Sequence, residues 1–139
     1  MSEPSGAWRA RPGSHLPAPR RWAVVAAGIG AGIGAGLLGT SLHGHVWYVS
    51  GVVIPLGAFA ALVLLAAVQI FVGLWSRSTW VVVVCGAASY LCAGLLSIPR
   101  GGFGMISGNV QGDVWLYGMA VVTPLVAWWI SAMVRAKKP

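Results

Sequence analysis

The chain has 139 residues, of which 58% are hydrophobic and only 8% are charged, and its net charge is +7. Soluble domains carry about 25% charged residues, so this chain cannot cover a water-exposed surface and much of it must face lipid. Seven of the nine basic residues lie before the first apolar run or after the last, which is where juxtamembrane charge lies. Since no basic face with interleaved aromatic residues exists, the composition predicts an integral membrane protein and argues against a nucleic-acid partner.

The first 21 residues contain four prolines together with glycine, serine and arginine, and they show no apolar period. This segment (1–21) is predicted to be a disordered, basic cytoplasmic tail. The apolar stretch that follows is longer than the 7–15 residues of a secretory signal sequence, and no small-residue cleavage site ends it. We therefore expect an uncleaved first helix.

Four apolar runs follow, each near the roughly 20 residues that span the hydrocarbon core of a bilayer. Short connections separate them, and no internal repeat is visible. The pattern predicts an all-α integral membrane four-helix bundle within residues 22–134, followed by a short basic tail at 135–139. The predicted helices are residues 22–42, 52–75, 80–97 and 114–134.

Two patterns predict the same orientation. Eight of the nine basic residues fall on one side of the predicted bundle, and Arg100 alone falls on the other. This asymmetry places both termini in the cytoplasm and the chain in the plasma membrane as a multi-pass protein. Aromatic residues also gather where the two membrane surfaces should lie. The predicted inner belt is Trp22, Trp75, Trp80, Trp128 and Trp129, and the outer belt is Trp47, Tyr48, Trp115 and Tyr117.

The first helix is rich in glycine and alanine, and its small residues repeat every four positions. Such rows let helix backbones approach closely in a membrane. We expect this helix to lie at the centre of the bundle or to pack tightly against at least two neighbours. The rows are Gly28, Gly32 and Gly36; Ala27, Ala31 and Ala35; and a third that begins with Gly30 and Gly34.

The two connections on the predicted outer side, 43–51 and 98–113, hold most of the polar side chains: His43, His45, Arg100, Asn109 and Asp113. The two histidines lack the third and fourth ligands that a zinc site needs, so we expect exposed side chains and neither metal nor cofactor. Asp113 either caps the fourth helix or pairs with Arg100 across the loop. The hypothesis is that partner or ligand recognition occurs on this extracytoplasmic face. The opposite side offers only tails and the turn at 76–79, which predicts no cavity there.

The four predicted spans contain no charged residue. Gln69 is their strongest polar group, and we expect it to bond to a neighbouring helix. Pro124 interrupts the fourth helix and frees a backbone carbonyl. Cys85 and Cys92 lie seven residues apart on one predicted helix, about 10.5 Å of rise, which is too far for a disulfide bond.

Three runs, PRGGFGMISGNVQGDVWLYGMAVV, GLLGTSLHGHVWY and PLGAFAAL, resemble a family of short four-helix membrane proteins of unknown function from high-GC Gram-positive bacteria (actinobacteria). The resemblance covers most of residues 23–134 and implies four helices and a plasma-membrane location. It implies no activity. In that family an acidic residue tends to follow the Pro-Arg pair, where this chain has Gly101 and Gly102, so no charged site carries over.

The predicted function is that of an accessory or scaffold protein that associates with other membrane proteins, or with itself, through its small-residue helix faces. The alternative is a small transporter or channel-like carrier without an intramembrane charged site, with Gln69 and Pro124 lining its path. An enzyme is not expected, because the sequence offers neither a nucleophile–base pair nor a set of metal ligands.

Overall fold

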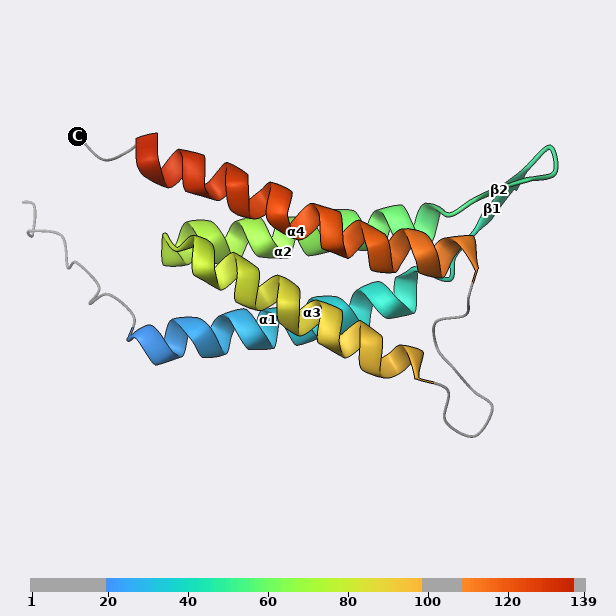
Figure 1. Ribbon diagram of the computed structural model, residues 1–139. Coiled ribbons are helices and arrows are strands. Elements are labelled where there is room, and N and C mark those ends of the chain that lie inside the picture. Colours follow the sequence, from blue (N-terminus) through green and yellow to red (C-terminus); the bar gives the residue numbers. More distant parts are fainter. Residues whose placement is uncertain (1–19, 99–108, 137–139) are drawn as a thin grey trace, which may run out of the picture.

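The computed structural model of the chain describes residues 20–98 and 109–136. Four helices run antiparallel to their sequence neighbours (Figure 1). Each is long and apolar enough to cross a membrane, so the chain is a multi-pass membrane protein and the predicted all-α four-helix fold is confirmed. The helices are α1 (Arg21–Leu42), α2 (Leu56–Ser76), α3 (Thr79–Ser97) and α4 (Val110–Ala136).

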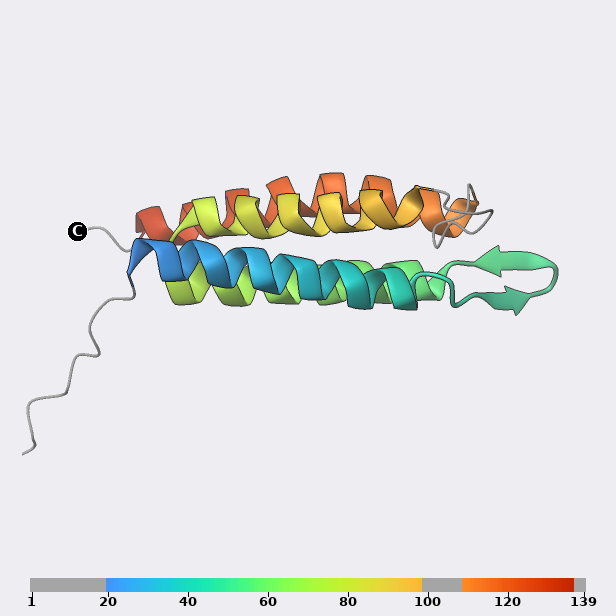
Figure 2. The same ribbon diagram turned by 90° about the horizontal axis from the view of Figure 1, so that it is seen from below.

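The bundle has two layers, α1 with α2 and α3 with α4 (Figure 2). α1 packs most extensively on α3 and then on α2, while α4 packs on α2 and α3. The helices α1 and α4 therefore occupy opposite corners, and α2 and α3 are the pair that meets across the middle. The first helix packs against two neighbours, as the second of the two predicted alternatives has it, and it does not lie at the centre.

Two helices differ from their predicted bounds by more than one residue. α2 begins at Leu56 rather than at residue 52, because residues 52–54 form a strand. α4 begins at Val110, four residues before the predicted start, and ends at Ala136. Most of the predicted basic tails, residues 1–19 and 137–139, lies outside the described residues.

An unpredicted β-hairpin joins α1 to α2. Strands β1 (Trp47–Val49) and β2 (Val52–Ile54) pair antiparallel. The two turn residues, Ser50 (φ 50°) and Gly51 (φ 83°), are both left-handed. Turns of this kind match the twist of a hairpin and favour glycine at the second position. The hairpin projects beyond the ends of the helices (Figures 1 and 2), so we call this end of the bundle the hairpin end.

One glycine row of α1 sets the distance to α3. A Cβ atom at Gly32 would lie 2.8 Å from the Cβ of Ala88 and would also collide with the carbonyl of Cys85. At Gly36 it would lie 3.0 Å from the carbonyl oxygen of Ser89, and at Gly28 3.0 Å from a methyl group of Val81. Only glycine permits this approach, so the row Gly28–Gly32–Gly36 is the α1 side of the α1–α3 contact.

The third glycine row of α1 points elsewhere. A Cβ atom at Gly30 or Gly34 would meet nothing within 4 Å, so these two residues make no packing contact within the described chain, contrary to expectation. The physical reason is that a helix buries one stripe at a corner position, and these residues lie outside it. A glycine that the rows did not include, Gly39, instead receives the fully buried indole of Trp115 from α4.

Candidate functional site

The two predicted histidines serve the end of α1. His43 is 5% exposed, and its Nδ1 donates to the backbone carbonyl of Thr40. The Nδ1 of exposed His45 lies 3.1 Å from the carbonyl oxygen of Leu42. The last carbonyls of a helix lack partners within it, and these imidazoles supply them. The expectation that both histidines are exposed is therefore wrong for His43, which has a structural role.

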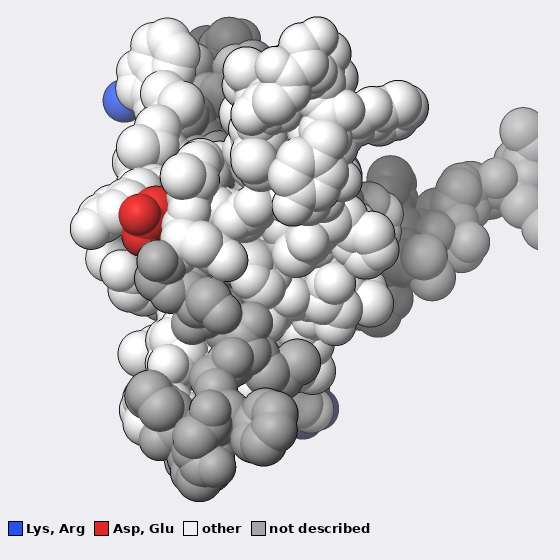
Figure 3. Space-filling view, turned by 90° about the vertical axis from the view of Figure 1, so that its right-hand side faces the viewer, with Lys and Arg blue, Asp and Glu red and all other residues white. Residues whose placement is uncertain are grey.

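Asn109, not Asp113, caps α4. The Oδ1 atom of Asn109 accepts a hydrogen bond from the backbone N–H of Gly112 at 2.9 Å, as an N-cap side chain does. Asp113 lies in the first turn of the helix, where its charge suits the helix dipole. Asp113 is the acidic residue among those that the structure describes, and Figure 3 shows acidic atoms in red at the hairpin end. Arg100 lies outside the described residues, and so does its predicted pairing with Asp113.

The predicted recognition residues do not converge on one site. Among residues 20–98 and 109–136, no group of three or more His, Cys, Asp or Glu side chains could hold a metal ion. His43 and His45 bind carbonyls of α1, whereas Asn109 and Asp113 stabilise the start of α4. The described contacts of these four residues are therefore contacts at the ends of helices, two at the end of α1 and two at the start of α4.

The hairpin is the most exposed apolar element that the sequence reasoning missed. Trp47, Tyr48 and Val52 are 62%, 70% and 63% exposed. The 22 residues of α1 span about 33 Å at 1.5 Å per residue, which already matches a hydrocarbon core of about 30 Å. The hairpin therefore begins at the boundary of the hydrocarbon core and extends away from it. Contiguous apolar exposure outside the hydrocarbon is typical of a contact surface.

Three hydrogen bonds connect the helices in the interior. The hydroxyl of Ser89 donates to the carbonyl oxygen of Gly32 at 2.7 Å. The indole N–H of Trp115 donates to the hydroxyl of Thr40 at 3.4 Å. The amide Nε2 of Gln69 donates to the hydroxyl of Thr123 at 2.8 Å, so the predicted bond from Gln69 to a neighbouring helix is present. The Oε1 atom of Gln69 is buried without a hydrogen-bond partner among the described residues.

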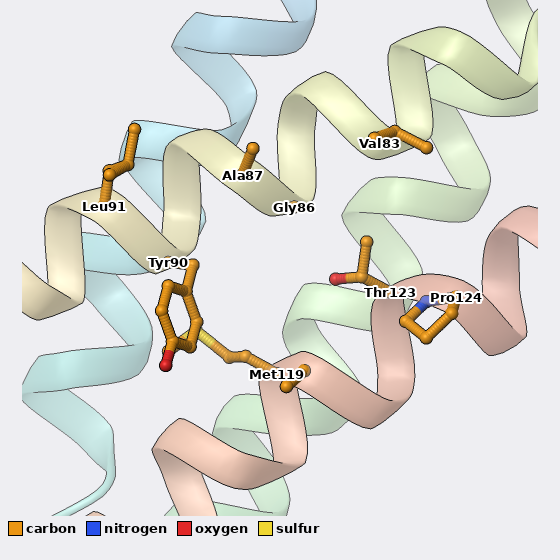
Figure 4. A pocket seen from close by; sticks show the side chains of 9 residues that line it. Val83, Gly86, Ala87, Tyr90, Leu91, Met119, Thr123 and Pro124 are labelled. Atoms are coloured by element: carbon orange, nitrogen blue, oxygen red, sulfur yellow. The ribbon is translucent and has the colours of Figure 1, made fainter.

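A cleft of about 460 Å³ lies between α3 and α4, and Figure 4 shows the side chains that line it. Tyr90, Met119 and Thr123 face it together with Pro124. Because proline has no N–H, the carbonyl of Ala120, four residues earlier, loses its helical donor, and Ala120 also lines the cleft. This cleft is almost entirely apolar and lies along the outside of the helix pair. Gln69 does not line it.

The opposite end of the molecule, which we call the basic end, carries Arg20, Arg21, Arg77 and Arg135. A cleft of about 490 Å³ opens there between the start of α1, the end of α2 and the start of α3. The expectation that this end has no cavity is wrong. The turn at 76–79 is indeed too short to enclose one by itself, but it lies beside the start of α1, and residues of all three helices line the cleft.

Comparison of the chain with protein-family models, with curated proteins and with solved structures found no match. The resemblance to a family of actinobacterial membrane proteins therefore stays a prediction.

Proposed function

We propose that this chain is an accessory protein of the plasma membrane that associates with other membrane proteins. The observation that carries the proposal is the β-hairpin, whose side chains at Trp47, Tyr48 and Val52 are more than half exposed beyond the helix ends. A two-stranded hairpin is marginally stable in water by itself. A partner that covers these side chains would remove their apolar surface from water and stabilise the hairpin.

The outer face of α1 supports the same proposal. Ala26, Gly30 and Gly34 follow each other at four-residue spacing, and both glycines border open space. Contact with lipid accounts for exposed leucine or valine side chains in a membrane protein. It does not account for a row of glycines, which offers lipid few side-chain contacts. A second helix could approach such a groove closely. Because α1 leads directly into the hairpin, a partner could contact both surfaces at once.

The proposed orientation has both termini in the cytoplasm and the hairpin outside. It is supported by the arginines Arg20, Arg21, Arg77 and Arg135, which all lie at the basic end. Basic residues favour the cytoplasmic side of a membrane. Asp113, the acidic residue among those that the structure describes, lies at the hairpin end.

The test compares two tyrosines of matched exposure. Tyr48 on the hairpin is 70% exposed and Tyr117 on α4 is 72% exposed. A photo-reactive amino acid replaces one or the other in the full chain in native membranes, and cross-linked partners are identified by mass spectrometry. We expect the probe at position 48 to cross-link to a defined protein partner, and we expect Gly30→Leu to reduce the yield of that product. The probe at position 117 should give only lipid adducts or background. Equal products from both positions would contradict the proposal.

A carrier is the second candidate, and the unpartnered Oε1 atom of Gln69 favours it. A carrier needs a continuous polar route through the bundle. Gln69 and Pro124 do not share a cleft in the described residues, and the cleft beside Pro124 is apolar. Solute or ion flux into vesicles that contain only this protein, abolished by Gln69→Leu, would favour the carrier over the accessory protein.

A further inference from the structure

The cleft at the basic end changes in character with depth. Its rim is lined by three residues that lie at the helix ends, Arg21, Ser78 and Trp80. One helical turn deeper, about 6 Å at 1.5 Å per residue, Val25 of α1 and Val84 of α3 form its walls. The rim lies at the helix ends, and therefore at the membrane surface, whereas the walls lie within the hydrocarbon.

The rim is positively charged without a described counter-charge. Arg21 forms no ion pair within residues 20–98 and 109–136, and the acidic residue described there, Asp113, is at the far end of the bundle. Ser78 precedes α3 without making a side-chain capping hydrogen bond, so its hydroxyl is free to bind a ligand. α3 begins at Thr79, between Ser78 and Trp80, so the partial positive charge of its N-terminus lies at the same end of the bundle.

Trp80 fits the same surface. It is 77% exposed and lies in the first turn of α3, where an indole can keep its ring in the apolar layer and its N–H among headgroups. Ser76, the other rim hydroxyl, already donates to the carbonyl oxygen of Val72 at 2.6 Å. The donors left for a ligand are therefore those of Arg21, Ser78 and Trp80.

We propose that this cleft is a binding site for one anionic phospholipid, whose phosphate lies against Arg21 and Ser78 and whose acyl chain runs between Val25 and Val84. Charge complementarity selects the headgroup, since basic pockets between transmembrane helices bind anionic headgroups. The apolar walls select a molecule with a chain rather than a free anion. A site of this kind would fix the depth and rotation of α1 relative to α3 at the membrane surface.

Native mass spectrometry of the purified full chain tests the proposal by measuring the Kd of phosphatidylglycerol and of phosphatidylcholine. Arg21→Gln should weaken phosphatidylglycerol binding about fivefold, the effect of one basic residue at an anionic membrane surface. Arg135→Gln is the matched control, because it removes the same charge from the same end of the bundle but lies outside the cleft. Arg135→Gln should therefore change the Kd of phosphatidylglycerol by less than twofold.

Two further arms separate the possible ligands. Val25→Trp keeps every charge and narrows the apolar part of the cleft, so it should also weaken lipid binding while circular dichroism stays unchanged. Glycerol phosphate, which has the headgroup chemistry without chains, should fail to displace the lipid. Displacement by glycerol phosphate would identify a site for soluble anions and overturn the proposal. Equal losses in Arg21→Gln and Arg135→Gln, or equal binding of phosphatidylcholine, would also overturn it.

Discussion

Replacing Gly32 by alanine is the sharpest test of the packing between α1 and α3. The new methyl group would lie 2.8 Å from the Cβ of Ala88 and against the backbone carbonyl of Cys85, neither of which can rotate away. Overpacking of this kind costs about 1–3 kcal/mol. Separation of the helices would also lengthen the 2.7 Å hydrogen bond from Ser89 to Gly32. Against this, alanine gains about 0.8–1.0 kcal/mol in helix propensity over glycine.

The matched control is Gly30→Ala, which makes the same chemical change two residues away where nothing lies within 4 Å. It should raise the free energy of unfolding by the propensity gain alone. We therefore expect Gly32→Ala to be less stable than Gly30→Ala by about 1–3 kcal/mol. Unfolding in mixed micelles of increasing denaturing-detergent fraction, followed by circular dichroism, measures both. Equal unfolding curves would refute the inference that one row of α1 is packed and the other is open.

Three further predictions concern the interior, the hairpin and the orientation. Gln69→Leu should leave the stability in detergent unchanged or raise it by up to about 1 kcal/mol, because it removes a buried acceptor that has no partner. Thr123→Val should lower the stability by about 1 kcal/mol, since it leaves the amide of Gln69 without its acceptor. A larger loss of stability in Gln69→Leu than in Thr123→Val would contradict the described hydrogen bond. Ser50→Asn should increase, and Gly51→Ala decrease, the protection of hairpin amides from hydrogen exchange, because both turn residues have positive φ, and equal protection would contradict the turn. After replacement of the two native cysteines, a cysteine at Ser50 should react with a membrane-impermeant maleimide in intact cells and one at Ser78 should not, and labelling at Ser78 would reverse the proposed orientation.

The four helices could be predicted because a helix that crosses lipid needs a long apolar run, and each of these four helices has such a run. The same apolar character prevented the prediction of the hairpin. Val52–Ile54 is as apolar as the helix that follows, so hydropathy merges them into one run. A local signal was present, since Ser50 and Gly51 separate two short β-branched or aromatic segments and Pro55 precedes the helix. Turn chemistry, rather than hydropathy, was the feature needed to find this element.

The glycine rows show a different limit. Spacing predicts that Gly28, Gly32 and Gly36 share a face and that Gly30 and Gly34 lie on another, but it does not say which face meets a neighbour. The direction depends on where α3 returns, which is a tertiary fact. For His43, the hydrogen bond to the carbonyl of Thr40 is a local contact at the helix end, whereas the burial of its ring depends on the folded chain around it and not on spacing. The candidate recognition surface is therefore the hairpin, which includes Trp47 and Tyr48 of the predicted outer loop 43–51, and not the polar side chains of the two loops.

The contact between α1 and α3 has a consequence for the order of events during synthesis. The hydrogen bond from Ser89 joins residues 57 positions apart. At 5–20 residues per second, the glycine face of α1 waits about 3–11 s in the membrane before its partner segment is made. Throughout that interval the chain displays two bare-backbone grooves instead of one, and any neighbouring helix with small residues can compete for the first. A chain that ends before α3 would leave that groove uncovered permanently, so the exposed glycine face would distinguish an incomplete chain from a complete one for the membrane's quality-control proteins.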